Sequence, residues 1–171
     1  MRDSISIARV NSLHPKIRQE VHDLIEKAES KMPGVAVRIV QGYRTFAEQD
    51  ALYAQGRTKP GNIVTNSKAG QSYHNYGLAI DFALLSDKDN NGTYETMSWD
   101  TLKDFDKDGE SDWMEVVNVF EEAGYTWGGR FHSIKDQPHF EKNFGINWRQ
   151  LLEKYNAKHV IPGTNYVNIG L

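Results

Sequence analysis

Apolar residues recur every three or four positions in four stretches of the chain, which is the spacing of one face of an amphipathic helix. The first predicted helix covers residues 13–28, where Pro15 suits the first turn. The second covers residues 45–56, because this stretch begins with a Thr-x-x-Glu capping box and ends at a glycine. The same spacing predicts helices over residues 112–123 and 147–156.

Patterns typical of strands separate these helices. Residues 35–42 alternate valine and isoleucine with other residues, which predicts a buried or half-buried strand. Residues 77–82 place three large apolar side chains on one face and an aspartate among alanines on the other. An Asn-Gly pair within residues 86–99 predicts a hairpin. Shorter strands are expected within residues 125–131 and 138–144.

The order of these elements is mixed, because helices and strands do not alternate strictly, and such an order is typical of the α+β class. We expect a small, mainly antiparallel sheet flanked by helices. A chain of 171 residues is long enough to bury one sizeable core. Residues 1–171 are therefore predicted to form a single compact domain, and we expect a monomer.

Composition excludes several classes of protein. With 39% hydrophobic and 25% charged residues, the chain has the make-up of an ordinary globular protein rather than a disordered one. A net charge of -3, without a run of lysine or arginine, argues against binding to a nucleic-acid backbone. The chain has no cysteine, so a transition metal would have to be bound by histidine, aspartate or glutamate.

Two further expectations concern the location of the protein. The first residues of the chain lack the apolar segment of a secretory signal, so we expect synthesis in the cytoplasm without a signal peptide. Apolar runs in the sequence are too short to cross a bilayer, so we expect no insertion into a membrane.

One aspartate and two histidines are the strongest candidates for chemistry. Asp81 stands in an apolar strand, where an uncompensated carboxylate is costly. His74 precedes it by seven residues, and the turn-prone residues 75–77 can let both side chains point the same way. His139 follows Asp136 in a second polar segment, and three such ligands would make a catalytic zinc site with one position open to water. The alternative for each is a hydrogen-bonded structural role.

Two segments carry a family resemblance: SYHNYGLAID, residues 72–81, and DQPHFE, residues 136–141. They resemble the Ser-x-His-x-x-Gly-x-Ala-x-Asp and Asp-x-x-His signatures of zinc D-alanyl-D-alanine carboxypeptidases and peptidoglycan L-alanyl-D-glutamate endopeptidases. Further matches extend the resemblance over about residues 13–144. The resemblance implies a fold like that of hedgehog and D,D-peptidase domains. It also implies that zinc is bound by His74, Asp81 and His139.

The same resemblance gives roles to other residues. Asp136 matches the general base, and an aspartate rather than a glutamate there favours the endopeptidase branch. Arg44 matches an arginine that steadies a developing oxyanion or a substrate carboxylate. Ser72 matches a hydroxyl that helps to hold substrate, and Trp127 is expected to line the cleft. The residues alone leave other roles open: a surface arginine, a turn serine and a core tryptophan.

The resemblance therefore implies a zinc-dependent endopeptidase that hydrolyses the L-alanyl-D-glutamate bond of peptidoglycan stem peptides. Such enzymes are common as phage lysins, so we expect a phage or prophage endolysin that acts on the cell wall and is released with the help of a holin. Two alternatives stay open. One is a D-alanyl-D-alanine carboxypeptidase, and the other is a non-catalytic, zinc-stabilised module that binds the cell wall.

Residues 104–115, DFDKDGESDWME, match the Asp-x-Asp-x-Asp-Gly spacing and the final glutamate of an EF-hand calcium loop. A solvated acidic turn is the alternative, and a calcium sensor is disfavoured because a second paired hand is missing. A similar start at Asp87 has Ser98 in place of the final glutamate, so the hairpin is favoured there. The spacing predicts calcium ligands from six residues: Asp104, Asp106, Asp108, the carbonyl of Glu110, Asp112 and Glu115.

Overall fold

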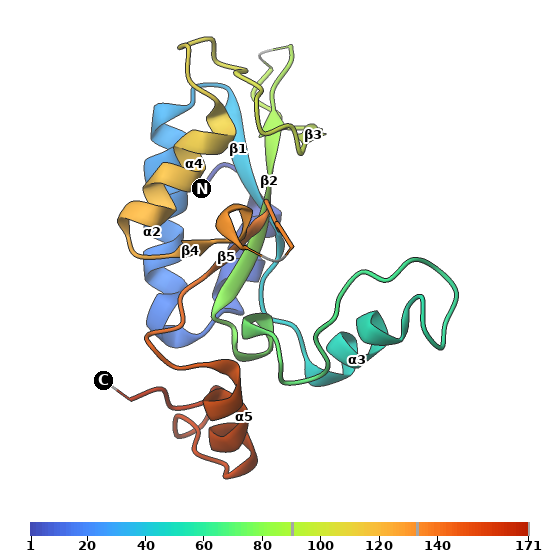
Figure 1. Cartoon of the computed structure of the whole chain (residues 1–171). Coiled ribbons are helices and arrows are strands. Elements are labelled where there is room, and N and C mark those ends of the chain that lie inside the picture. The colour runs from blue at the N-terminus through green and yellow to red at the C-terminus, as the bar shows by residue number, and fades with distance from the viewer. Residues whose placement is uncertain (90, 133, 171) are drawn as a thin grey trace.

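The sheet is built around β2, its longest strand. The computed structural model describes residues 1–89, 91–132 and 134–170, and within them five antiparallel strands form one sheet (Figure 1). β1 pairs with one edge of β2, β5 and β3 pair with the two halves of the other edge, and β4 extends the sheet beyond β5. The strands are β1 Val35–Gln41, β2 Ala79–Ser86, β3 Thr96–Ser98, β4 Thr126–Trp127 and β5 His139–Glu141.

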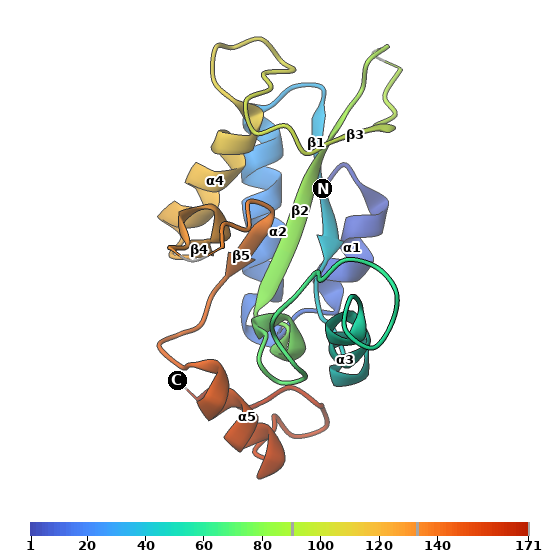
Figure 2. The ribbon, with the colours of Figure 1, turned by 45° about the vertical axis from the view of Figure 1, so that its right-hand side comes forward.

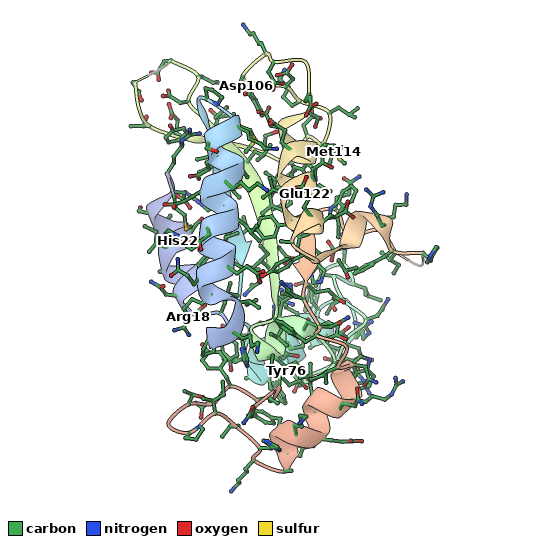
Figure 3. All side chains as sticks on the ribbon, turned by 90° about the vertical axis from the view of Figure 1, so that its left-hand side faces the viewer. Arg18, His22, Tyr76, Asp106, Met114 and Glu122 are labelled. Carbon is green, nitrogen blue, oxygen red and sulfur yellow. The ribbon has the colours of Figure 1, made fainter. Side chains whose placement is uncertain are left out.

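Helices cover the sheet and close one end of the molecule. α2 and α4 lie side by side on one face of the sheet (Figure 3), and α1 packs along β1 (Figure 2). α3 and α5 lie at the lower end of the view in Figure 1. The helices are α1 Ser4–Asn11, α2 Pro15–Lys31, α3 Phe46–Ala54, α4 Asp112–Glu122 and α5 Trp148–Asn156, with two 3-10 turns, η1 Tyr73–Tyr76 and η2 Gly128–Arg130.

The first predicted amphipathic helix is α2, and its apolar face enters the core. Ile17, Val21 and Ile25 are fully buried, and their spacing of four residues places them on the same face. The helix begins at Pro15, where the missing backbone N–H costs nothing. The ring of His14 caps this end by accepting a hydrogen bond from the backbone of Lys16, which gives His14 a structural role.

Aromatic rings pack between β2, β5 and α4. The ring of Phe82 lies 4.2 Å from Trp113 and 5.5 Å from Phe140, and Phe140 lies 4.9 Å from Phe120. Burying a phenylalanine side chain contributes about 1.5–3 kcal/mol. This cluster therefore fixes one face of β2 against the helices, as the alternation of residues 77–82 predicts, and turns Asp81 towards the other face.

Most of the predicted elements are confirmed, including the α+β class and the antiparallel sheet. Residues 86–99 contain the expected hairpin, because Leu84 of β2 pairs with Ser98 of β3, although Asn90 lies outside the described residues. The strand expected over residues 125–131 is limited to Thr126–Trp127, because the chain then turns into η2. α1 is an element that the apolar pattern does not predict. In the part of the chain that the structure describes, helices lack the length and apolar character needed to cross a bilayer.

Candidate active site

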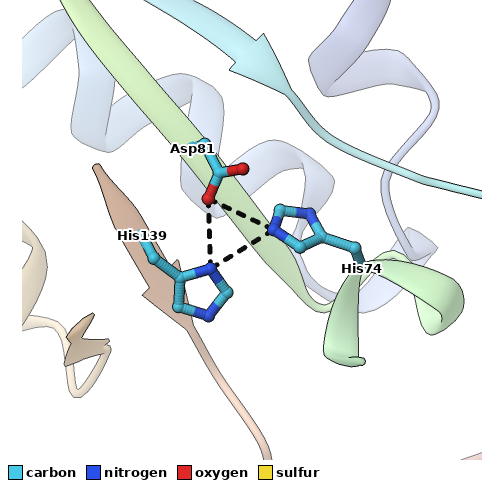
Figure 4. Close-up of side chains that lie close together, drawn as sticks. All are labelled: His74, Asp81 and His139. Carbon is cyan, nitrogen blue, oxygen red and sulfur yellow. Dashed lines mark hydrogen bonds and ion pairs between the residues drawn. The ribbon is translucent and has the colours of Figure 1, made fainter. Parts of the chain in front are cut away.

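Three side chains from two distant segments of the sequence converge at one point (Figure 4). Nε2 of His74 lies 3.2 Å from Oδ1 of Asp81 and 3.2 Å from Nδ1 of His139, and the aspartate and His139 atoms are 3.1 Å apart. Asp81 and His139 are directly opposite each other in the β2–β5 register. The sheet itself therefore sets the distance between two members of the cluster, and η1 supplies the third.

A tight turn brings His74 to the same side as Asp81. Gly77 ends η1 in the left-handed conformation, with φ 69°, which glycine adopts without strain. A side chain at this position would also approach the backbone nitrogen of His14 to 2.6 Å. The turn-prone residues 75–77 thus interrupt the extended chain before β2 and let His74 and Asp81 point the same way, as the sequence predicts.

The partners of the two histidine rings determine which nitrogens face the cluster. Nδ1 of His74 lies 2.8 Å from the carbonyl oxygen of Gly42, so it is the N–H that donates there. Nε2 of His139 lies 3.0 Å from a carboxylate oxygen of Glu141 and donates to it in the same way. Each ring consequently turns a lone pair towards Asp81. With both rings neutral, three acceptor atoms therefore meet at one point, an arrangement that a proton on one ring or a metal cation satisfies.

The electrostatics of the cluster favour a positive charge at the same point. Burial alone would raise the pKa of Asp81, but the charges and hydrogen bonds of His74 and His139 outweigh burial and hold that pKa far below its usual range. Burial would lower the pKa of His139, but hydrogen bonds to Asp81 and Glu141 raise it to about 9. The site thus stabilises the carboxylate and draws a cation towards it.

The spacing of the three atoms fits a tetrahedral metal. Zinc bonds of about 2.0–2.1 Å at tetrahedral angles separate neighbouring ligand atoms by roughly 3.3 Å. The separations of 3.1–3.2 Å found here are close to that value. Two histidines and one carboxylate also leave a fourth position open, which is typical of catalytic rather than structural zinc sites. His74, Asp81 and His139 therefore fit the ion that the sequence predicts.

The cluster lies in the wall of a cleft of about 470 Å³. Arg44, Ser72 and Asp136 line the same cleft, so the structure brings together the three predicted zinc ligands and three of the other predicted site residues. Glu141 and Tyr73 also line it. The walls also include Val64 and the polar residues Thr65, Ser67 and Gln71 from the long loop of residues 57–71 that follows α3.

The guanidinium of Arg44 lies beside the cluster. Its Nη1 donates to Gln49, its Nη2 lies 3.8 Å from Asp81, and its Nε is buried without a hydrogen-bond partner among the described residues. Burial lowers the pKa of Arg44, and the nearby negative charges of Asp81, Glu48 and Asp136 oppose that shift. A largely buried guanidinium whose side chain lines the cleft is suited to bind an anionic group that enters it.

Asp136 is held at the rim of the cleft by its backbone. Its N–H donates to the carbonyl oxygen of Gly128, and its own carbonyl accepts from the N–H of His139. A Cβ atom on Gly128 would overlap the carbonyl oxygen of Asp136, so only glycine permits this approach. Burial of the carboxyl group and the charge of Asp81 raise the pKa of Asp136. A carboxylate in such surroundings takes up a proton more readily than a free one.

Comparisons with known proteins point to one family. A family profile described as D-alanyl-D-alanine carboxypeptidase matches residues 65–142. Peptidoglycan L-alanyl-D-glutamate endopeptidase CwlK of Bacillus subtilis (strain 168) is 48% identical over 131 residues, which cover 77% of this chain and 74% of that protein. The chain belongs to this family of peptidoglycan peptidases.

Two other relatives are more distant. L-alanyl-D-glutamate peptidase of Listeria phage A118 is 28% identical over 141 residues, which cover 82% of this chain and 42% of that protein. The crystal structure of the L-Ala D-Glu endopeptidase ChiX of Serratia marcescens has a TM-score of 0.49 and 17% identity. That match covers 82% of this chain and 88% of the solved chain.

Ser72 and Trp127 occupy different positions relative to the cleft. Ser72 lines it and also caps η1, where its hydroxyl accepts a hydrogen bond from the backbone of His74. Trp127 is not among the described residues that line the cleft. Its indole N–H donates to the carbonyl oxygen of Gln137, and its ring packs against Gly129. This position supports the segment that precedes His139, and a contact of Trp127 with substrate stays a prediction.

Two buried amides organise the cleft without having been singled out in the sequence. Gln49 is fully buried in α3, where it accepts from Arg44 and donates to the carbonyl oxygen of Ser67. Asn75 is 3% exposed and donates to the carbonyl oxygen of Arg44. In the sequence, Gln49 is a polar residue within a capped helix, and Asn75 follows a candidate metal ligand. Both residue types are common at such positions for other reasons, so the sequence gives little indication of these roles.

Proposed function

We propose that the protein is a zinc-dependent endopeptidase that hydrolyses the L-alanyl-D-glutamate bond of peptidoglycan stem peptides. The observation that supports this most strongly is the convergence of three lone-pair atoms within 3.2 Å in the wall of a cleft that also holds Arg44 and Asp136. The name of the Bacillus subtilis relative and the aspartate at position 136 favour this bond over the D-alanyl-D-alanine bond.

Zinc would be held by Nε2 of His74, Oδ1 of Asp81 and Nδ1 of His139. Once bound there, it supplies Lewis-acid polarisation of the scissile carbonyl and of a water molecule. Glu141 keeps the His139 ring in the required tautomer, and the carbonyl of Gly42 does the same for His74. These hydrogen bonds orient the ligands before any metal arrives.

Asp136 is the general base in this proposal. Its carboxylate accepts a proton from the attacking water and then donates it to the nitrogen of the leaving amine. The contacts of Gly128 and His139 with the Asp136 backbone keep the carboxylate at the edge of the cleft during both steps.

Arg44 binds the negative charge of the substrate or of the transition state. The glutamate residue of a stem peptide carries a carboxylate next to the scissile amide, and the side chain of Arg44 lines the cleft that this carboxylate would enter. Gln49 holds the other end of the guanidinium, so the side chain is positioned before substrate binds.

Digestion of purified peptidoglycan by the zinc-loaded protein tests the proposal. Mass spectrometry of the products is expected to find new C-terminal L-alanine and new N-terminal D-glutamate. Release of D-alanine would instead indicate a carboxypeptidase, and binding to peptidoglycan without new termini would indicate a non-catalytic module. The Asp136→Asn variant, with zinc still bound, is expected to release at least about 100-fold fewer termini.

We also propose that the enzyme is a phage or prophage endolysin, made in the cytoplasm as a monomer and released to the cell wall with the help of a holin. Support comes from the relative in Listeria phage A118. Expression in a bacterial cytoplasm with and without a co-expressed holin tests this. Lysis is expected only with the holin, and equal lysis in both cultures would contradict the proposal.

A further inference from the structure

The acidic loop of residues 104–115 lies far from the zinc cluster. Figure 3 places Asp106 at the upper end of the molecule and Tyr76, which belongs to η1 next to His74, near the lower end. The loop precedes α4 and folds around the side chain of Asp104, whose two oxygens accept from the backbone N–H groups of Lys107 and Gly109 at 2.6 and 3.0 Å. Gly109 has φ 99°, which permits the sharp turn that an EF-hand loop needs.

Carboxylates of this loop form two groups that share one residue. Oxygen atoms of Asp104, Asp106 and Asp108 lie within 4.8 Å of one another, and so do oxygen atoms of Asp106, Asp112 and Glu115. Because Asp106 belongs to both groups, the two groups are adjacent. Five carboxylates thus lie next to one another and offer oxygen atoms only, a set that suits a hard divalent cation.

The burial of these groups shows that the loop is more than a solvated acidic turn. Asp112 is fully buried and Glu115 is 4% exposed. Oδ1 of Asp112, Oε2 of Glu115 and Oδ2 of Asp106 are buried without a hydrogen-bond partner among the described residues. An ionised carboxylate in that condition is strongly unfavourable unless a cation compensates it.

Mutual repulsion acts within the cluster, because oxygen atoms of Asp106, Asp112 and Glu115 lie within 4.8 Å of one another. Repulsion of this kind disappears when a divalent cation neutralises the cluster.

We propose that residues 104–115 bind one calcium ion, which joins the loop to the first turn of α4. The carboxylates of Asp104, Asp106 and Asp108 hold it from the loop, and those of Asp112 and Glu115 hold it from the helix. The carbonyl oxygen of Glu110 occupies the remaining position of the EF-hand spacing. Six oxygen positions match the preference of calcium, whereas the nitrogen-containing cluster at His74 suits zinc.

The loop that begins at Asp87 provides an internal comparison. Its turn is similar, because Asp87 accepts from the backbone N–H groups of Asn91 and Gly92, and Gly92 has φ 85°. It has Ser98 where the other loop has Glu115, and its described residues include no buried unpaired carboxylate. The turn alone therefore does not create the unpaired carboxylates, and substitutions in this second loop are suitable controls.

The calcium ion would act on stability through α4. Trp113 follows Asp112 in the first turn of α4, and its ring packs 4.2 Å from Phe82. Phe82 is next to Asp81 in β2. An ion that fixes the start of α4 therefore stabilises the layer beneath the strand that carries Asp81, without contacting the cleft.

Terbium luminescence of the zinc-loaded protein in calcium-free buffer tests the site directly. Terbium takes the same oxygen ligands as calcium, and Trp113 is close enough in the chain to sensitise its emission. We expect one terbium per chain, displaced by calcium, and a calcium-dependent rise in the melting temperature. Absence of sensitised emission and of any thermal shift at millimolar calcium would overturn the proposal.

Two variants assign the site. Glu115→Gln is expected to weaken calcium binding at least 100-fold while melting no lower than the wild type without calcium, because the substitution removes repulsion. Asp89→Asn, in the exposed second loop, is expected to keep wild-type affinity and the full thermal shift. Wild-type affinity in Glu115→Gln, or loss of binding in Asp89→Asn, would overturn the assignment to residues 104–115. Neither outcome depends on the peptidase activity.

Discussion

Asp81 and His139 face each other across the β2–β5 ladder, with Oδ1 and Nδ1 3.1 Å apart. Because direct cross-strand neighbours have a nearly fixed separation, backbone hydrogen bonding sets this distance before a metal binds. The third ligand, His74, comes from a turn that a left-handed glycine closes. Two ligands thus depend on sheet register and the third on one tight turn.

Removal of His139 is expected to abolish metal binding. In His139→Ala, one of three ligands and the partner of Glu141 disappear, so zinc content measured by elemental analysis should fall from one per chain to nearly none. His159→Ala is the matched control, because His159 is exposed. Retention of one zinc by His139→Ala would show that the ion is held elsewhere.

Glu141→Gln is expected to weaken zinc binding without removing a ligand. The carboxylate accepts a hydrogen bond from Nε2 of His139 and fixes the ring, and loss of such a partner typically costs about 10–100-fold in metal affinity. Competition with a zinc-binding dye measures the effect. Glu153→Gln changes an exposed glutamate and should leave the affinity unchanged. An unchanged affinity in Glu141→Gln as well would remove Glu141 from the site.

Arg44→Lys is expected to lower kcat/KM by about 100-fold, or roughly 3 kcal/mol, with zinc still bound. A lysine keeps the charge but lacks the planar fork through which Arg44 donates to Gln49 with Nη1 and lies near Asp81 with Nη2. Arg149→Lys, at an exposed position, is the control. Steady-state kinetics on peptidoglycan fragments give kcat/KM for both variants. Equal values for Arg44→Lys and Arg149→Lys would show that Arg44 does not act in catalysis.

Gly128→Ala is expected to destabilise the protein by about 1–3 kcal/mol and to reduce activity, because the added methyl group overlaps the carbonyl of Asp136 and crowds His139. Urea unfolding gives the stability change, and zinc content shows whether His139 has moved. Wild-type stability and activity in Gly128→Ala would mean that the segment around Asp136 can move away from the added methyl group without loss of free energy of unfolding.

Acid is expected to weaken the attachment of α1 to the sheet through Asp3. Burial raises the pKa of Asp3, but hydrogen bonds from Arg38 and Ser6 outweigh burial and lower it below its usual value. Asp3 therefore contributes stability above the pKa it has when unfolded, about 3.9, and loses it as the pH falls through the lower folded pKa. Its charged hydrogen bonds to Arg38, at 2.7 and 2.8 Å, are of a kind that contributes about 1.5–3 kcal/mol each.

Comparison with Asp3→Asn isolates this contribution. The difference in unfolding free energy between wild type and variant should be constant near neutral pH and shrink below about pH 4. Effects of acid on the histidine cluster are common to both proteins and cancel. A difference that is independent of pH down to pH 2 would contradict the account.

The sequence predicts those parts of the site in which a charged residue interrupts an apolar pattern. An aspartate in an apolar strand is costly, so Asp81 stands out, and the register of short strands then brings His139 to it. It does not predict α1, whose buried residues, Ser6 and Val10, do not form an apolar stripe. That helix is held by polar contacts with β1, including the pair of Asp3 with Arg38. Such contacts depend on tertiary neighbours that local patterns do not contain.

The same reason explains why Gln49 and Asn75 escape prediction. Both are buried amides whose partners are backbone carbonyls or Arg44, and a buried amide in sequence looks the same as an exposed one. Trp127 is an aromatic residue for which the sequence suggests a place in the cleft wall. In the structure it donates to the carbonyl oxygen of Gln137 and packs against Gly129, and its contact with substrate stays a prediction.

Zinc titration of the metal-free protein tests the central claim most directly. The measured quantity is the rate at which L-alanine C-termini and D-glutamate N-termini appear in purified peptidoglycan as zinc is added. We expect the rate to rise in proportion to zinc and to stop rising at one ion per chain. Cleavage of the same bond by the metal-free protein, or none at one zinc per chain, would contradict a peptidase built on His74, Asp81 and His139.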